Sequence, residues 1–248
     1  MLRRCVILQA IVALLAVGSS GCGKSEANSS APGTSAKPAA LGHGVIRGRV
    51  MFSGTPPTMA VIDTKGTCPH AGTIHDESIV VNGNGTLKNV LVFLKDVKDS
   101  PEPSSNPVLL DQVHCTYVPH VLGIQVGQPL VLKSSDDTMH NVHLMCQVNE
   151  DVNRGMSGPG ELAPMFFKAS ESPFKVKCDI HPWMTAWIGV FDHPYFAVTG
   201  DDGTFEIKNV PAGTYTLAAW QEVLPQQEQQ ITVSDDRPGA ATFTFRAP

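Results

Sequence analysis

The sequence predicts an all-β fold, and three observations lead to that prediction. Short alternating or continuous apolar runs, typical of strands, follow one another from Val45 onward. With 22 glycines and 19 prolines among 248 residues, turn signals recur every several residues. No long segment has the apolar period of a helix. The length suits one large or two small domains, and a net charge of −5 without a run of Lys or Arg argues against a nucleic-acid partner.

Residues 1–22, MLRRCVILQAIVALLAVGSSGC, predict an export signal. Two arginines precede an apolar run that is too short to span a bilayer comfortably, and small residues follow it. The ending SSGC resembles the lipobox of bacterial lipoproteins, although Ser19 stands where that motif usually has leucine. The resemblance implies that a lipid on Cys22 anchors the mature protein in the periplasm or at the cell surface. The alternative is cleavage and release, and in both cases the protein works outside the cytoplasm.

Residues 23–43 predict a flexible tether, because they are rich in Ser, Ala and Pro. An overlapping stretch at 18–25, GSSGCGKS, matches the pattern of a phosphate-binding loop. Such a loop needs a buried strand before it and a helix after it, whose N-terminus meets the phosphate. Here the export signal precedes the stretch and the tether follows it, so nucleotide binding is not expected.

The expected strands are apolar or alternating runs bounded by turn residues. Loops at 99–107 and 147–171 separate them, and the sequence GDDG at 200–203 is a hairpin signal. The runs cover residues 45–52, 89–95, 120–126, 127–133, 140–145, 173–178, 186–191, 195–199, 203–208, 214–220, 229–233 and 241–245.

The two ends of the folded part resemble one family of small β-sandwiches. Residues 198–220, VTGDDGTFEIKNVPAGTYTLAAW, are similar to the carboxypeptidase regulatory-like sandwich, and IRGRVMFSGTPP at 46–57 is similar to its opening strand. The resemblance implies that residues 44–106 and 193–248 form one sandwich into which residues 107–192 are inserted. Two sandwiches in sequence, packed together, are the alternative arrangement.

The stretch CDIHPWM, residues 178–184, places a thiol, an imidazole and a thioether at three-residue intervals. Upstream, HNVH at 140–143 offers a further imidazole. Two histidines, one thiolate and a weak axial thioether are the ligands of a blue-copper site. Zinc rarely recruits a thioether, so this donor set favours copper.

These paired motifs resemble the cupredoxin family, and within it the amicyanin type, over roughly residues 115–192. The resemblance implies a Greek-key β-sandwich with one type 1 copper centre. It assigns the copper ligands to His140, Cys178, His181 and Met184.

Three neighbouring residues are expected to support that centre. Asn141 would hydrogen-bond across to the cysteine loop, as it does in cupredoxins, and Pro182 would stiffen the loop. Trp183 would form an apolar electron-transfer patch with His181 and Pro182, with plain packing as the alternative.

The sequence therefore predicts an exported carrier of single electrons, not an enzyme, because the site offers neither an acid–base pair nor an open substrate position. The expected partner is a redox protein such as a c-type cytochrome or a dehydrogenase, and the only expected membrane contact is the lipid anchor. The alternatives are copper capture or delivery, and a structural surface protein with a vestigial copper site.

Six cysteines are present, of which Cys5 would leave with the signal. Once the anchor and the ligand are also set aside, Cys68, Cys115 and Cys146 remain. An oxidising compartment favours a disulfide. A Cys68–Cys115 bond would staple the N-terminal segment to the first cupredoxin strand, and Cys115–Cys146 is the alternative pairing.

Overall fold

The computed structural model describes residues 41–68, 70–95, 97 and 100–247. The expected export signal, Cys22 and nearly all of the tether lie outside these residues. Nineteen strands and no helix are present in the described part of the chain, which confirms the all-β fold class. Within the same residues, no helix has the length and apolar character needed to cross a membrane.

Ten strands build what we call the first sandwich. One sheet has the order β10-β9-β13-β14-β7 and the other β11-β8-β5-β6, with β12 also paired to β8. Alternating burial along β8 and β13 directs every second side chain into a core that both sheets share. The strands are β5 (Val108–Val113), β6 (Thr116–Val118), β7 (Val121–Gln125), β8 (Pro129–Ser134), β9 (His140–Leu144), β10 (Val152–Met156), β11 (Gly160–Glu161), β12 (Met165–Phe166), β13 (Glu171–Lys177) and β14 (Thr185–Phe191).

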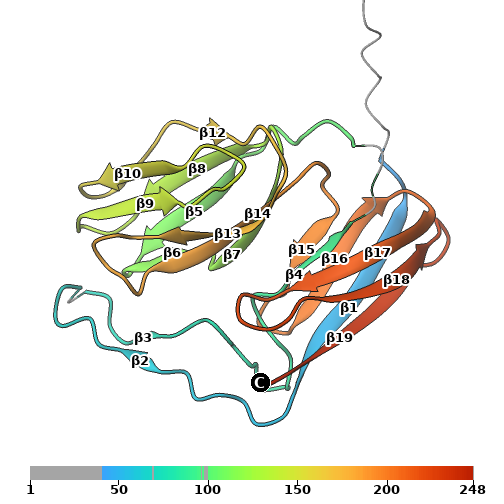
Figure 1. Cartoon of the computed structure of the whole chain (residues 1–248), viewed down its shortest axis with the longest axis horizontal. Coiled ribbons are helices and arrows are strands. Elements are labelled where there is room, and N and C mark those ends of the chain that lie inside the picture. Colours follow the sequence, from blue (N-terminus) through green and yellow to red (C-terminus); the bar gives the residue numbers. More distant parts are fainter. Residues whose placement is uncertain (1–40, 69, 96, 98–99, 248) are drawn as a thin grey trace, which may run out of the picture. The chain divides into compact units, whose positions relative to one another are not determined.

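The second sandwich comes from two separated segments of the chain (Figure 1). Its sheets have the orders β16-β1-β19 and β15-β4-β17-β18 and enclose a core of their own. Because β1 pairs in parallel with β19 and antiparallel with β16, the first strand of the described chain needs the last ones as neighbours. The strands are β1 (Gly44–Ser53), β4 (Leu91–Leu94), β15 (Phe196–Val198), β16 (Thr204–Val210), β17 (Gly213–Trp220), β18 (Gln227–Val233) and β19 (Gly239–Arg246).

Residues 54–80, which we call the strap, differ from the predicted division of the chain. The division places them in the second sandwich, but Ile74 and Cys68 are buried in the core of the first, and Ile62 packs against it. The strap contains the short pair β2 (Val61–Ile62) and β3 (Ile74–His75), which passes below the first sandwich in Figure 1. Within its apolar run 59–62, Ile62 packs against the first sandwich while Met59 and Val61 are exposed, so the apolar pattern of the strap does not show which side chains are buried.

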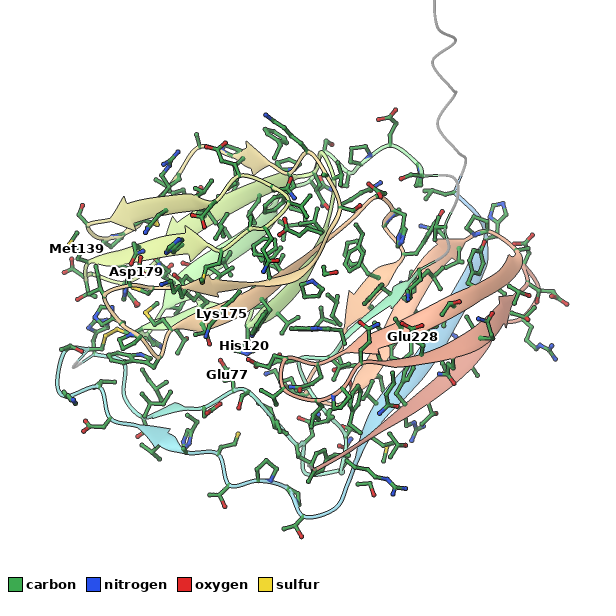
Figure 2. The ribbon with its side chains drawn as sticks, viewed as in Figure 1. Glu77, His120, Met139, Lys175, Asp179 and Glu228 are labelled. Carbon is green, nitrogen blue, oxygen red and sulfur yellow. A yellow bond between two sulfur atoms is a disulfide. The ribbon has the colours of Figure 1, made fainter. Side chains whose placement is uncertain are left out.

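The two sandwiches meet through aromatic and charged side chains. Trp187 of β14 and Trp220 of β17 lie with ring centroids 5.3 Å apart. Glu222 accepts a hydrogen bond of 2.7 Å from the Trp187 indole and lies 2.6 Å from His120 Nε2. The other ring nitrogen of His120 is 3.9 Å from Glu77 of the strap, which Figure 2 labels beside it. His120 therefore joins three parts of the fold.

Two buried histidines should respond to acid in opposite ways. Burial lowers the pKa of His193, whose Nε2 donates to the Leu94 carbonyl at 2.9 Å. Burial alone would also lower the pKa of His120, but its hydrogen bond to Glu222 and the charges of Glu222 and Glu77 raise it overall. As pH falls below the ordinary value of about 6.5, His193 favours the unfolded chain, which takes up the proton more readily. His120 instead favours the folded chain, and that stability is lost as pH rises through its raised pKa.

We expect His193→Gln to flatten the loss of unfolding free energy on acidification, and His120→Gln to steepen it. The change in slope is at most about 1.4 kcal/mol per pH unit for one proton. Urea unfolding of each variant between roughly pH 5 and pH 7.5 measures it. Equal slopes in both variants and the parent chain would contradict this account of the two histidines.

Candidate metal centre

The loop from Cys178 to Met184 is closed by its own backbone. Cys178 N donates to Met184 O at 3.1 Å, and Met184 N donates to His181 O at 2.9 Å. The loop joins β13 to β14, whose last pair next to it is Lys177 with Thr185. The two paired strands therefore hold three of the expected ligand residues on one short, closed turn.

His140 is the first residue of β9, and the pairing of β9 with β13 brings it close to this loop. β9 pairs with β13 through Leu144–Val176 and His143–Lys177, which aligns the start of β9 with the residues that follow β13. The Nδ1 atoms of His140 and His181 lie 3.0 Å apart, and Cys178 Sγ lies 3.8 Å from His181 Nδ1. All three donor atoms lie within 4.8 Å of one another.

Water is almost entirely excluded from these three side chains. His140 is 0% exposed, Cys178 1% and His181 4%. Met184, the expected fourth ligand, is 1% exposed and belongs to the core of the first sandwich. The structure thus gathers His140, Cys178 and His181 at one point, and ties Met184 to the same loop through its backbone.

Burial also sets the protonation of the imidazoles. It lowers the pKa of His140 against the opposing pull of Asp136, and it lowers the pKa of His181 together with the charge of His140. Neutral imidazoles carry the lone pair that a metal needs. The donor set is therefore two neutral imidazoles and a thiol, which fits a soft or borderline cation such as copper.

Asp136 also belongs to the candidate site, although no motif in the sequence indicates it. Its Oδ2 lies 3.0 Å from His140 Nε2, and its two oxygens accept hydrogen bonds from the backbone N–H groups of His114 and Cys115 at 2.6 and 2.7 Å. A carboxylate on the remote ring nitrogen fixes the tautomer that leaves Nδ1 free. The only available signal was its position four residues before His140, which does not by itself show contact in a loop.

Asn141 bridges β9 and the cysteine loop, as the resemblance implies. Its Oδ1 accepts a hydrogen bond from Asp179 N at 2.7 Å and lies 3.3 Å from Cys178 Sγ. Its Nδ2 donates to Asp179 at 2.9 Å and to Asn153 at 2.7 Å. Because both sides of the amide are engaged, its oxygen is held toward the cysteine loop.

The surroundings of Trp183 differ from an exposed electron-transfer patch. Trp183 is half-buried, its ring lies 5.2 Å from that of His181, and its indole N–H donates to Cys115 O at 3.1 Å. Pro182 is exposed. The large exposed apolar side chains next to ligands in the sequence are Met139 and Ile180, at 60% and 45% exposure.

Besides Cys178 in the candidate site, the described cysteines form one disulfide and one further free thiol. Cys68 and Cys115 form a disulfide with an S–S distance of 2.06 Å. Cys146 is free and half-buried, and burial together with the nearby Glu171 raises its pKa to about 12. His70, Cys115 and Asp136 also lie within 4.8 Å of one another, but the disulfide occupies the Cys115 sulfur, so this second cluster is not a metal site.

Comparisons with known proteins give partial similarities. A family model described as polysaccharide lyase family 4, domain II, matches residues 185–241, so the tail resemblance to the carboxypeptidase regulatory-like sandwich is not supported. No curated protein sequence matches the chain.

Three solved structures are similar to parts of the chain. A copper-containing nitrite reductase from Thermus scotoductus SA-01 is 21% identical with a TM-score of 0.32, over 40% of this chain and 25% of that one. A purple cupredoxin from Nitrosopumilus maritimus is 18% identical with a TM-score of 0.28, over 33% of this chain and 97% of that one. A reduced amicyanin variant is 20% identical with a TM-score of 0.31, over 36% and 86%. The chain thus spans about a quarter of the nitrite reductase.

Proposed function

We propose that this protein is a type 1 copper protein of the cupredoxin family that carries single electrons between redox partners. One observation carries the proposal: the donor atoms of His140, Cys178 and His181 lie within 4.8 Å of one another in a site closed to water. Copper bound there would supply a one-electron couple. Met184 would be the weak fourth ligand.

The residues around the site favour electron transfer over catalysis. Cys178 and His181 are held on a hydrogen-bonded loop, Asp136 lies against His140 Nε2, and Asn141 accepts a hydrogen bond from Asp179 N of the loop. A donor set held in this way changes its geometry little when the metal changes charge, so only a small reorganisation energy opposes electron transfer. With Met184 as the fourth protein ligand, the site would keep no position for a substrate, so we propose a carrier and not an enzyme.

We propose that a redox protein, such as a c-type cytochrome or a dehydrogenase, docks on the exposed residues Met139, Ile180 and Pro182. Each of the three precedes or follows a ligand in the sequence, so electrons need cross only a short distance. Figure 2 shows Met139 and Asp179 at the same end of the first sandwich, and Asp137 is also exposed. These carboxylates complement a partner with a basic rim.

We further propose that the protein works outside the cytoplasm, in the periplasm or at the cell surface, with a lipid on Cys22. The export-signal pattern supports this, as does the Cys68–Cys115 bond, since disulfides persist in oxidising compartments. Fatty-acid labelling of the parent chain and of Cys22→Ser would decide whether the anchor is made, because labelling must be lost in the variant.

A second candidate function is copper delivery. The exposed thioether of Met139, adjacent to His140 in the sequence, favours it, because such a group could receive or pass on Cu(I). Burial of all three close donors opposes it, since the ion would leave slowly.

Adding Cu(II) to the purified, metal-free protein should produce an intense visible thiolate-to-copper band at one equivalent. Cys178→Ser should abolish that band, because it removes the thiolate. Cys146→Ser is the matched control: it removes the other free thiol of the described residues, whose raised pKa keeps it protonated, and should leave the band unchanged. Absence of the band from the parent protein would contradict a type 1 copper centre and favour a structural surface protein with a vestigial copper site.

Removal of copper by a soluble chelator should separate the two functions. An electron carrier with these buried ligands should lose copper over hours, and Met139→Leu should not change that rate. Loss within seconds that slows in Met139→Leu would favour delivery. Loss of the visible band with time is the measurement.

Electron transfer to a c-type cytochrome with a lysine rim should slow as ionic strength rises, because salt screens the attraction. Asp137→Lys should reduce the bimolecular rate severalfold at low salt and far less at high salt. Asp235→Lys makes the same charge change in the turn between β18 and β19 of the second sandwich and should have little effect. Equal effects of the two variants in stopped-flow measurements would remove this docking surface.

A further inference from the structure

The turn between β5 and β6 has an unusual backbone. Its two central residues, His114 and Cys115, have φ angles of 51° and 55°, the left-handed region that favours glycine or asparagine. Neither residue prefers this conformation, so neighbouring contacts must hold it. Those contacts lead to both histidine ligands.

One set of contacts leads to His140. The Asp136 carboxylate accepts the N–H groups of His114 and Cys115 and faces His140 Nε2. Asp136 is 3% exposed, and a carboxylate buried to that degree needs each of these donors. A shift of the turn would therefore shift the group that selects the His140 tautomer.

The other set of contacts leads to His181. The Cys115 carbonyl accepts the indole N–H of Trp183, and the Trp183 ring lies 5.2 Å from the His181 ring. Trp183 is thus hydrogen-bonded to the turn through Cys115 O, and its ring also lies against the ring of His181. One residue, Cys115, contacts the supports of two ligands that are far apart in the sequence.

The disulfide fastens this turn to the strap. Cys68 is 2% exposed, and His70 on the same segment has its Nε2 3.7 Å from both Asp136 Oδ1 and Cys115 Sγ. The strap also places Ile62 and Ile74 in the wall of a cavity of about 320 Å³ that Trp183 and Met184 line as well. The strap and the turn therefore enclose the metal end of the first sandwich together.

We propose that the Cys115 turn is a positioning element for both histidine ligands, and that its disulfide to Cys68 keeps it in place. Cys115 and Trp183 are positioning residues, because they act through Asp136 and through the His181 ring and not as ligands. The proposal rests on the copper function for its consequence in the metal-bound protein. The contacts themselves concern the metal-free chain and can be tested there.

The deciding variant is Trp183→Phe, which keeps an aromatic ring against His181 and removes only the donor to Cys115 O. In the metal-free full chain, ¹⁵N NMR of the imidazoles should show that the ring signals of His140 move, although the path from Trp183 to His140 runs through Cys115 and Asp136. Cys68→Ser/Cys115→Ser, which leaves no new free thiol, should move the same signals. Trp187→Phe is the matched control: it removes an indole donor that serves Glu222 and should leave His140 unchanged.

In the copper-loaded protein, Trp183→Phe should change the ratio of Cu(II) to Cu(I) affinity about tenfold, equal to about 59 mV in reduction potential. Unchanged His140 signals in folded Trp183→Phe would overturn the proposal, whatever the double variant does. If the parent chain binds no copper, the proposed function fails, but the imidazole signals of the metal-free protein still decide the positioning role.

Discussion

A single buried carboxylate connects the parts of this molecule that matter for its site. Asp136 accepts two backbone N–H groups from the β5–β6 turn and faces the remote nitrogen of His140. A carboxyl group so deeply buried is tolerated only when its oxygens find hydrogen-bond donors. That requirement fixes the turn, the start of β9 and the imidazole relative to one another. The pocket in which we propose that copper binds is thus largely formed in the metal-free chain.

The two sandwiches divide the work of building the site. The first supplies every donor, on β9 and on the loop between β13 and β14. The strap follows β1 of the second sandwich, is fastened to the β5–β6 turn of the first by the Cys68–Cys115 disulfide, and precedes β4. Phe196 of β15 packs so closely on Gly123 of β7 that a Cβ there would lie 2.4 Å from its ring. The absence of a side chain at Gly123 therefore lets the second sandwich approach the first.

The features that the sequence could predict are those written in local patterns. Alternating runs such as 241–245 indicate directly which face is buried. The spacing of Cys178, His181 and Met184 predicts a loop of metal ligands. Asp136 could not be found in this way, because its partners at 114 and 115 approach only after β5, β6 and β8 have paired. The position of the strap could not be predicted for a similar reason, because the burial of Ile62 and Ile74 depends on a surface that is distant in the sequence. For Trp183 the sequence left an electron-transfer patch and plain packing both open, because nothing local indicates that its N–H donates to Cys115 O.

The parallel pairing of β1 with β19 has a consequence for how the chain acquires its structure. Ile46 pairs with Gly239, and all strands of the first sandwich lie between these two residues in the sequence. Contacts of such long range require closure of a very large loop, which makes folding slow and leaves the edge of β1 without that neighbour until β19 has been made. The first sandwich, whose neighbours lie closer together in the sequence, has no such delay. We therefore expect the first sandwich to become ordered before the second.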